Sequence, residues 1–315
     1  MSNQTKANKG VFEAIISGHK RIGEQFHRLS LQLEEPGAKA FVDTKPGQFA
    51  QLDLADTALP PKAQIPEQLW DAAQRKILLR RPFSFCSVSA KGQKTFMDIL
   101  YSVVGPATVR MTTLSAGDSI TVIGPLGNGF RIPVGKKRAL LVSGGMGVGP
   151  LMHLAKVLTD KRPDIEIFAF AGAKTAKKLP YEKPLDEISQ QLGFTIAEFA
   201  RYGVCSQVAT DDGSAGYNGF VTNCVEEWIG QNSSNAGDTI IYSCGPEKML
   251  AGMAKIAQKH NIECQLSMEQ MMACGIGICQ SCAVECKVPE SGETVYKMCC
   301  TDGPVFDSRE VVFKL

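Results

Sequence analysis

The last part of this 315-residue chain holds six of its eleven cysteines, at Cys274, Cys279, Cys282, Cys286, Cys299 and Cys300. The first three follow the spacing Cys-x4-Cys-x2-Cys, and a longer gap leads to the final pair. This is the plant-type spacing for a 2Fe–2S cluster, which four thiolates hold. Gly275 and Gly277 allow the loop to curl and to aim backbone N–H groups at sulfur. The spacing therefore predicts a 2Fe–2S cluster with Cys274, Cys279 and Cys282 as ligands.

Zinc is the main alternative occupant, because four thiolates also suit a tetrahedral zinc site. A zinc ribbon usually has two Cys-x2-Cys pairs, whereas only Cys279 and Cys282 form one here. A non-enzymatic, zinc-stapled binding module is the matching alternative function. The residues alone leave the fourth ligand open among Cys286, Cys299 and Cys300, although Cys286 follows Cys282 too closely to reach a second iron easily.

A glycine-rich turn, VSGGMGVGP, separates an apolar strand from a helix-like stretch and contains Gly144, Gly145 and Gly147. Glycines at such a turn let the backbone approach a pyrophosphate, which then meets the helix N-terminus. Pro150 occupies the place of the third glycine of GxGxxG, so the strict fingerprint fails, but proline is tolerated in the first turn of a helix. The glycine-rich turn is interpreted as a nucleotide site, and a tight strand-to-helix turn without a ligand is the alternative.

A second segment, YSCGPEKM, lies at the carboxyl end of a later predicted strand. Ligands of open α/β sheets bind at these ends, so Cys244 and Gly245 are expected to border the same crevice as the glycine-rich turn. Two interpretations of Cys244 are equally compatible with its position: a contact near the nicotinamide, or an inert buried thiol.

The segment RRPFSFCSV combines Arg81 with an alternating run in which Phe83 and Phe85 flank Ser84. Arginine binds phosphate in a bidentate manner, and a hydroxyl on the other face of the strand could meet a ring edge. An edge strand opened by Pro82, with a surface arginine, is the plainer alternative.

The elements that position these residues fall into three parts. Short β-rich runs at 11–20, 25–33, 47–54, 82–88, 95–104 and 118–126 predict an antiparallel barrel over residues 1–135, with an excursion near 55–80. Strands then alternate with helices over 136–269, which predicts a doubly wound parallel α/β domain. The expected strands are 139–144, 165–172, 194–199, 239–245 and 262–268, and the expected helices are 149–160, 181–192, 220–230 and 246–260. Residues 270–315 form a small cysteine-rich segment, too short for a large core.

Composition narrows the class of protein. The hydrophobic fraction of 44% and the charged fraction of 21% are typical of a globular chain. A formal net charge of +2 gives no reason to expect nucleic acid or an anionic membrane as a partner. No apolar run is long enough for a membrane span, and the polar start lacks the core of a secretion signal. A cytoplasmic protein is expected, in which clustered cysteines indicate metal binding before disulfides.

Taken in order, RPFS, VVGPAT, GPLGNGF, GGMGVGP and CGPEKM resemble the ferredoxin-NADP reductase-like flavoproteins over residues ~10 to 265. The resemblance implies a Greek-key barrel that binds FAD and an α/β domain that binds NAD(P)H. It also implies FAD contacts from Gly105 and Thr108, although GPATV lacks the second glycine of the usual pattern. The remaining contacts that it implies are with FAD for Arg81, Pro82, Phe83 and Ser84, and with the nicotinamide nucleotide for Gly144, Gly145, Gly147, Pro150, Cys244 and Gly245.

The tail, MMACGIGICQSCAVEC followed by CCTDGPVF, is similar to the electron-transfer subunits of two-subunit, NAD-dependent dihydroorotate dehydrogenases. In that family the last cluster ligand directly precedes x-Asp-Gly-Pro-Val-Phe, which implies Cys300 as the fourth ligand and Cys299 as its rival. The resemblance implies electron transfer between NAD(H), FAD and a 2Fe–2S cluster. It further implies an FMN-containing catalytic subunit as partner, in a heterotetramer of pyrimidine biosynthesis.

The function and the nucleotide each have an alternative. Small subunits of electron-bifurcating NADH-dependent ferredoxin:NADP reductases, and related hydrogenase or oxygenase reductases, share the architecture and are the alternative function. The acidic pair Asp211 and Asp212 would disfavour the extra phosphate of NADP, which favours NAD weakly, although such a pair is more often a solvated turn.

Overall fold

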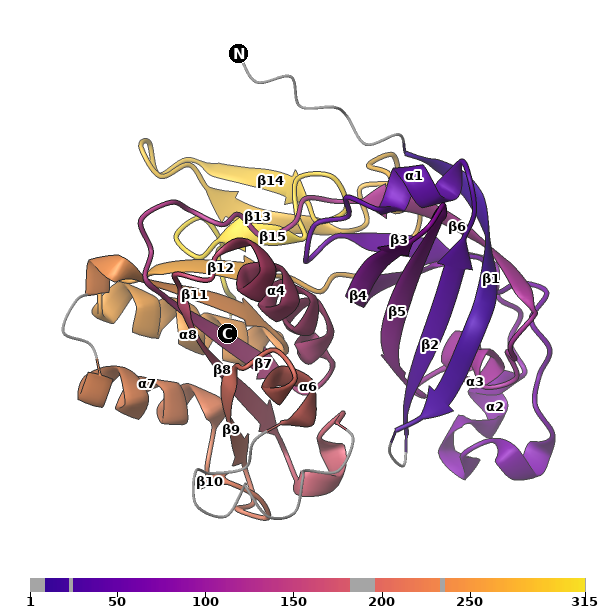
Figure 1. Ribbon diagram of the computed structural model, residues 1–315, viewed down its shortest axis with the longest axis horizontal. Coiled ribbons are helices and arrows are strands. Elements are labelled where there is room, and N and C mark those ends of the chain that lie inside the picture. The colour runs from indigo at the N-terminus through magenta and orange to yellow at the C-terminus, as the bar shows by residue number, and fades with distance from the viewer. Residues whose placement is uncertain (1–8, 23–24, 182–195, 233–235, 315) are drawn as a thin grey trace.

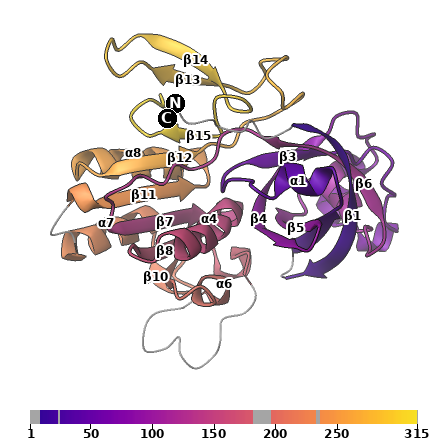
Figure 2. The ribbon, with the colours of Figure 1, turned by 45° about the horizontal axis from the view of Figure 1, so that its top comes forward.

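The computed structural model describes residues 9–22, 25–181, 196–232 and 236–314. Figure 1 shows a barrel on the right, an α/β layer on the left and the C-terminal segment above the junction between them. Figure 2, turned by 45°, shows the C-terminal hairpin on the same side as β12 and β15. The expected multidomain β plus α/β architecture is confirmed.

Six strands close the N-terminal barrel in the order β1-β2-β5-β4-β3-β6, and every neighbouring pair is antiparallel. Alternate residues along each strand point into the barrel, where Leu31, Phe85 and Val122 are fully buried, as the period-two pattern predicts. The elements are β1 (Gly10–Arg21), β2 (Phe26–Leu33), α1 (Gly37–Phe41), β3 (Phe49–Leu52), α2 (Trp70–Ala73), β4 (Arg81–Lys91), β5 (Lys94–Ser102), α3 (Pro106–Met111) and β6 (Ser119–Leu126).

The excursion between β3 and β4 packs against α3. Ile65 and Ala73 of the excursion form a small apolar cluster with Val109 of α3, and Trp70 lies at its edge. Two short 3-10 turns, Lys62–Gln64 and Glu67–Leu69, precede α2 in this segment. The excursion therefore supports the turn that precedes α3.

The central sheet has the order β10-β9-β8-β7-β11-β12-β15, and its first six strands are parallel. The chain builds outward from β7 in both directions, so the order reverses between β7 and β11, which is the switch point of a doubly wound sheet. The elements are β7 (Arg138–Gly144), α4 (Val148–Lys161), β8 (Glu166–Ala173), α6 (Ala197–Ala200), β9 (Cys205–Thr210), β10 (Tyr217–Asn218), α7 (Val221–Asn232), β11 (Thr239–Cys244), α8 (Glu247–Lys259) and β12 (Glu263–Ser267).

One predicted strand of this domain is wrong. The described part of 194–199 begins the short helix α6, and the strand that follows β8 in the sheet is β9 instead. Ile196 and Phe199 are three residues apart and both buried, a helical spacing that the alternation at 194–199 concealed. The helix expected near 181–192 lies outside the described residues, apart from residue 181.

The C-terminal segment has no large core of its own. A hairpin of β13 (Ala283–Lys287) and β14 (Thr294–Met298) is followed by β15 (Val305–Asp307), which pairs antiparallel with β12. Cys282, Cys286 and Cys299 are buried in the same apolar cluster as residues of the α/β domain. The segment thus relies on its neighbours, and the boundaries 1–135, 136–269 and 270–315 stay predictions.

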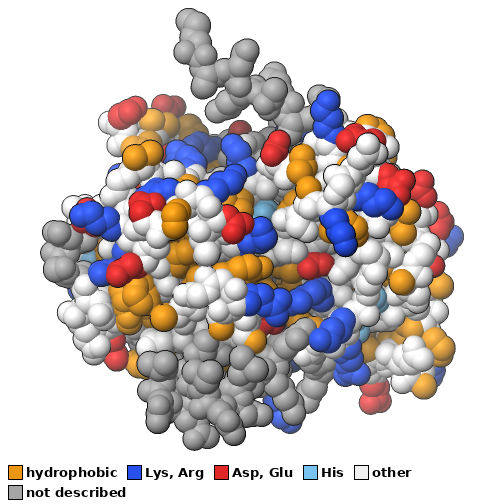
Figure 3. Space-filling view, in the orientation of Figure 1, with side chains coloured by type: hydrophobic (Ala, Val, Ile, Leu, Met, Phe, Trp, Pro, Cys, Tyr) orange, Lys and Arg blue, Asp and Glu red, His pale blue; other side chains and the backbone are white. Residues whose placement is uncertain are grey.

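The face of the molecule shown in Figure 3 carries charges of both signs. On the face shown in Figure 3, basic, acidic and hydrophobic side chains are interspersed, in keeping with the net charge of +2. None of the described helices has the length and apolar character that a membrane crossing requires.

Candidate cofactor sites

The glycine-rich turn and the CGP segment meet at the switch point of the sheet. Ser143 pairs in register with Cys244, so the carboxyl ends of β7 and β11 lie side by side. A Cβ atom at Gly147 would lie 2.0 Å from the Cys244 carbonyl oxygen, and one at Gly245 would lie 2.9 Å from the Gly144 nitrogen. Side chains at these positions would force the two turns apart, which explains why both are glycine.

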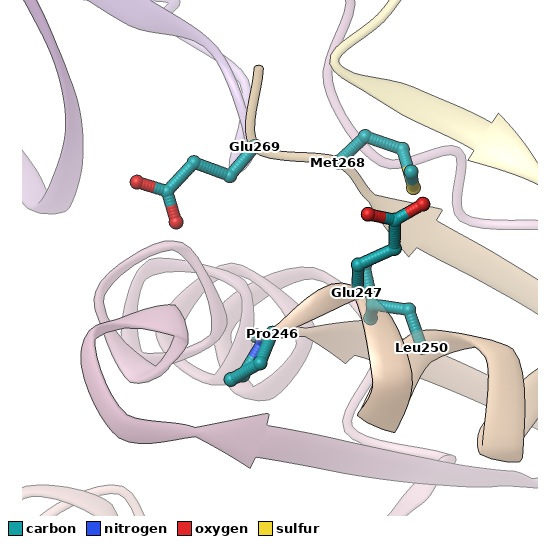
Figure 4. Close-up of a pocket in the computed structure, with 6 residues that line it drawn as sticks. Pro246, Glu247, Leu250, Met268 and Glu269 are labelled. Carbon is teal, nitrogen blue, oxygen red and sulfur yellow. The ribbon is translucent and has the colours of Figure 1, made fainter. Parts of the chain in front are cut away.

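The start of α4 leaves open backbone for a ligand. Gly145 has a φ of +52° and no atom within 4 Å of the position of a Cβ, and Pro150 lies buried in the first turn of the helix. A cavity of about 130 Å³ borders the same crevice, lined by Gly245 and Pro246. In Figure 4 the carboxylates of Glu247 and Glu269 reach it from the start of α8 and from the segment after β12. The geometry fits a nucleotide held by backbone groups.

Cys244 lies between this crevice and the cysteine-rich segment. Burial raises the pKa of its thiol to about 12, against a hydrogen bond with Ser267 that lowers it. The thiol is therefore neutral near pH 7 and suits contact with a ring rather than nucleophilic chemistry.

The strand that carries the predicted flavin residues has two distinct faces. Phe85 is buried in the barrel and Phe83 packs against the same core, whereas Pro82 and Ser84 are partly exposed. Antiparallel pairing sets Pro82 opposite Gln51 and Ser84 opposite Phe49, so these four side chains share the outer face of the barrel. The expected alternation of Phe and Ser along this strand is observed.

Arg81 begins β4, where the excursion returns to the barrel. Its Nη1 donates hydrogen bonds to the carbonyl oxygens of Leu79 and Arg80, at 2.7 Å and 3.2 Å. These contacts order the guanidinium and leave its other N–H groups for an anion.

The turn before α3 contains the other predicted phosphate contacts. The Thr108 hydroxyl accepts hydrogen bonds from the backbone N–H groups of Val104 and Gly105, at 2.9 Å and 3.1 Å. It also donates to the Gly105 carbonyl oxygen at 3.1 Å. Thr108 therefore shapes the start of α3 with its side chain, and Gly105 is left with open space where a Cβ would lie.

Helix α4 brings the two nucleotide sites together, because it packs against barrel strand β4. The position of a Cβ at Gly149 lies 3.9 Å from the Cβ of Cys86. Across the same junction, Arg28 of β2 forms an ion pair of 3.5 Å with the buried Glu198 of α6. The glycine-rich turn and the RPFS strand thus face a common junction.

The cysteine-rich loop arranges four thiols in two pairs. The thiol of Cys279 lies beside Cys274, and the thiol of Cys300 lies beside Cys282. The Cys274 sulfur also accepts N–H groups from Ile276 and Cys279, at 3.5 Å and 3.4 Å. Two pairs of thiols lined by N–H donors fit a 2Fe–2S cluster, in which each iron takes two thiolates. In the described part of the chain, no group of three or more His, Cys, Asp or Glu side chains meets the geometry of a metal site.

The pKa values of Cys279 and Cys300 shift in opposite directions. A hydrogen bond with Ser281 is the main reason that the pKa of Cys279 falls to about 6. Burial and the neighbouring Cys282 thiol together raise the pKa of Cys300 to about 11, although the N–H group of Gly277 acts in the opposite direction. The exposed end of the loop therefore favours thiolate before any metal binds.

Cys299 and Cys300 point in different directions because they lie in a tight turn. The carbonyl oxygen of Met298 accepts N–H groups from Thr301 and Asp302, at 3.1 Å and 2.8 Å. The Cys299 thiol donates to the Met268 carbonyl oxygen at 3.5 Å, whereas the Cys300 thiol faces Cys282. This geometry supports Cys300 over Cys299 as the fourth ligand. Cys286 lies in β13, fully buried in the apolar cluster.

Sequence reasoning missed a barrel residue that holds the turn after Cys300. Asn128 donates through Nδ2 to the carbonyl oxygens of Thr301 and Asp302, at 2.9 Å and 3.0 Å. Its backbone N–H donates to the Gly303 carbonyl oxygen at 2.6 Å. The GPLGNGF motif, which marked the end of the barrel, therefore also positions a predicted cluster ligand.

Gln51 of β3 was missed as well. Its side chain is 0% exposed, and neither Nε2 nor Oε1 has a hydrogen-bond partner among the described residues. The cluster loop covers it, because a Cβ at Gly275 would lie 2.3 Å from Nε2. An unpaired buried polar group costs on the order of 1–3 kcal/mol. The signal in the sequence was a polar residue on the same strand face as Phe49.

Gly275→Ala is expected to lower iron retention sharply, because the new methyl group would collide with Gln51 and because Gly275 has a φ of +70°. Gly292→Ala is the matched control, since Gly292 has the same φ of +70° and no atom within 4 Å. The free energy of unfolding of the control should fall only by the cost of the left-handed backbone, about 1–2 kcal/mol. Iron analysis and thermal unfolding measure both, and equal behaviour of the two variants would contradict the contact with Gln51.

Comparisons with known proteins identify two of the domains that contain these residues. The family model described as "Iron-sulfur cluster binding domain of dihydroorotate dehydrogenase B" matches residues 269–312, and "Oxidoreductase NAD-binding domain" matches residues 141–255. A solved structure titled as an NADH-dependent reduced ferredoxin-NADP oxidoreductase is similar in fold, with a TM-score of 0.69 at 24% identity, and covers 95% of this chain and 89% of that one.

Curated relatives match almost the whole chain. The protein named "Dihydroorotate dehydrogenase B (NAD(+)), electron transfer subunit" from Caldanaerobacter subterraneus subsp. tengcongensis is 35% identical over 301 residues, 96% of this chain and 98% of its own. The protein of the same name from Bacillus caldolyticus is 36% identical over 94% of this chain and 96% of its own. This chain belongs to the family of electron transfer subunits of dihydroorotate dehydrogenase B (NAD(+)).

Proposed function

We propose that this chain carries electrons between NAD(H) and an FMN-containing catalytic subunit that oxidises dihydroorotate to orotate. FAD and a 2Fe–2S cluster supply the electron chemistry when they are bound, and the chain supplies their position and surroundings. The observation that carries the proposal is the meeting of three segments: α4 packs on β4, and the cluster loop packs on β3, the neighbour of β4. Cofactors bound at these three segments would lie next to one another, which supports the proposal.

Each part of the chain has a separate task in this proposal, with the modules divided at 1–135, 136–269 and 270–315. In the barrel, Arg81 pairs with the FAD pyrophosphate, and the outer face of β4 lies along the flavin ring. In the α/β domain, the glycine turns admit the nicotinamide nucleotide. The proposed contacts are Arg81, Pro82, Phe83, Ser84, Gly105 and Thr108 for FAD, Gly144, Gly145, Gly147, Pro150, Cys244 and Gly245 for NAD(H), and Cys274, Cys279, Cys282 and Cys300 for the cluster.

The cluster loop is also the proposed docking surface for the catalytic subunit. Met271, Ile276 and Ile278 are 87%, 46% and 76% exposed around the cluster cysteines. Exposed apolar side chains gathered in one place favour contact with another protein. A partner seated here would shorten the path from its flavin to the cluster, within a heterotetramer.

NAD is the proposed nucleotide, and the cytoplasm is the proposed compartment. Asp212 accepts hydrogen bonds from the N–H and hydroxyl of Ser214, at 3.0 Å and 2.6 Å, which orders the turn after β9. An ordered carboxylate at a strand end would repel the extra phosphate of NADP. All eleven cysteines are free thiols, which suits a reducing compartment.

Affinity purification of the tagged chain from its own cells, with flavin and metal analysis of the eluate, tests the proposed function. We expect a co-purifying FMN protein that oxidises dihydroorotate in the presence of NAD. A larger partner with flavin and 4Fe–4S clusters would support a bifurcating reductase instead. A colourless, zinc-containing chain without flavin would overturn both enzyme assignments.

Arg81→Ala is expected to weaken FAD retention at least tenfold, because a bidentate arginine–phosphate contact contributes about 1.5–3 kcal/mol through its charged hydrogen bonds. Flavin absorbance relative to protein after gel filtration measures the retention. Arg201→Ala, on the exposed end of α6, is the control and should keep its flavin. Full flavin occupancy in Arg81→Ala would count against the pyrophosphate contact.

A further inference from the structure

We propose that the buried amide of Gln51 is a positioning residue for the cluster, and that its Nε2 group donates a hydrogen bond to cluster sulfur. This inference rests on the proposed function, because it assumes that the cysteine-rich loop holds a 2Fe–2S cluster. It concerns a barrel residue that lies more than two hundred positions before the cluster cysteines in the chain.

Gln51 lies on the outward face of β3. Ala50 and Leu52 point into the barrel core, so Gln51 and its neighbour-but-one Phe49 point outward. The outward face of β3 is buried all the same, because the cysteine-rich segment covers it: Phe49 belongs to the apolar cluster that also contains Cys282 and Cys300. Gln51 is the polar side chain enclosed at this contact between barrel and tail.

The Gln51 side chain contacts the cluster loop at Gly275. Gly275 directly follows Cys274, and the atom nearest to the position of its Cβ is Nε2 of Gln51, ahead of Cγ and Cδ of the same side chain at 2.8 Å and 2.9 Å. The amide therefore packs against the loop, with Nε2 toward Gly275. Only glycine allows this approach, since Gly275 combines the contact with a φ of +70°.

The described residues offer the Gln51 amide no hydrogen-bond partner. Both polar atoms of the Gln51 side chain are buried and have no hydrogen-bond partner among the described residues. Gln48, which directly precedes β3, contrasts with Gln51 because its side chain is fully paired. Its Nε2 donates to the Gly127 carbonyl oxygen at 2.8 Å, and its Oε1 accepts from the N–H of Lys45 at 2.8 Å. Buried polar groups are normally paired, so an unpaired amide pressed against a cofactor loop points to the cofactor as its partner.

The chemical consequence follows from charge. One-electron reduction of a 2Fe–2S cluster adds negative charge that is shared with its sulfur atoms, and an N–H donor stabilises that charge. Gln51 would therefore raise the reduction potential of the cluster. Gln51 pairs across the sheet with Pro82, beside the proposed flavin face. Its hydrogen bond would therefore change the reduction potential of the cluster relative to that of the flavin with which the cluster exchanges electrons.

The test is a redox titration of the cluster, followed by EPR, in the holoprotein and in Gln51→Leu. Leucine keeps the volume and removes both polar atoms. We expect about a tenfold fall in the ratio of reduced to oxidised cluster at a fixed potential, which corresponds to about 59 mV for a one-electron couple. Gln51→Glu, of the same shape but with a carboxylate in place of the donor, should shift the potential further in the same direction.

Gln32→Leu is the matched control, since Gln32 lies on β2, is only partly buried and hydrogen-bonds to Glu34. It should leave the potential unchanged. An unchanged potential and EPR line shape in an iron-loaded Gln51→Leu protein would overturn the inference while leaving the proposed function intact. A wild-type protein without any iron would overturn the proposed function instead.

If Gln51→Leu loses its iron, the cluster potential of Gln51→Glu is compared with that of the wild type instead. If the glutamate variant loads iron and keeps the wild-type potential, the donor role is wrong. If it loads iron with a lower potential, the donor role is supported.

Discussion

Replacing Cys300 by Ser is expected to remove the EPR signal and the iron of the cluster while FAD stays bound in the barrel. The Cys300 thiol pairs with Cys282, and a serine hydroxyl is a poor substitute for a soft thiolate ligand. Iron should fall from about two atoms per chain to well below one. The flavin should remain because its proposed contacts lie on β4 and at the turn before α3.

Cys299→Ser is the matched control for this result. The Cys299 thiol donates to the Met268 carbonyl oxygen and lies in the apolar cluster, so a serine there can make the same hydrogen bond. The control should keep its iron and EPR signal and lose only a little stability. The opposite pattern, with Cys299→Ser losing the cluster and Cys300→Ser keeping it, would show that the fourth ligand is Cys299.

Gly147→Ala is expected to impair the reaction with NADH by about a hundredfold in kcat/KM. A Cβ at Gly147 would lie 2.0 Å from the carbonyl oxygen and 2.3 Å from the carbonyl carbon of Cys244, both of them backbone atoms that cannot rotate away. The two turns that form the nucleotide crevice would have to separate, and a displacement of about 1 Å can cost a hundredfold in rate. Overpacking should also cost about 1–3 kcal/mol of unfolding free energy.

NADH-dependent reduction of ferricyanide and urea unfolding measure these two effects. Gly230→Ala is the control, because Gly230 lies in α7 with no atom within 4 Å of the position of a Cβ. Alanine there should raise stability by roughly 0.5–1 kcal/mol and leave kcat/KM unchanged. Normal kinetics with NADH in Gly147→Ala would contradict the placement of the nucleotide at this turn.

Much of the fold could be predicted because local patterns determine it. The period-two runs of the barrel and the alternation of apolar strands with helices after residue 135 are signals that a short stretch carries by itself. The glycine turn is also a local signal. The two elements that flank it, β7 and α4, begin and end within one or two residues of their predicted bounds. The strand predicted at 194–199 failed because the apparent alternation of that stretch concealed the helical spacing of Ile196 and Phe199.

The contacts that complete the sites could not be predicted, since they join segments far apart in the sequence. Asn128 holds the turn after Cys300 from the end of the barrel, and Gln51 meets Gly275 from β3. Spacing alone also left Cys299 and Cys300 equivalent. The turn at Met298 separates them, and its effect depends on the position of Cys282 across the loop.

The most direct test of the central claim is an anaerobic titration of the purified chain with NADH, followed by visible absorbance and EPR. We expect NADH to bleach the flavin and to produce the EPR signal of a reduced 2Fe–2S cluster in the same chain, with about two irons per FAD. A chain that holds zinc, or one whose flavin is reduced by NADH while the cluster never receives an electron at any potential, would contradict it.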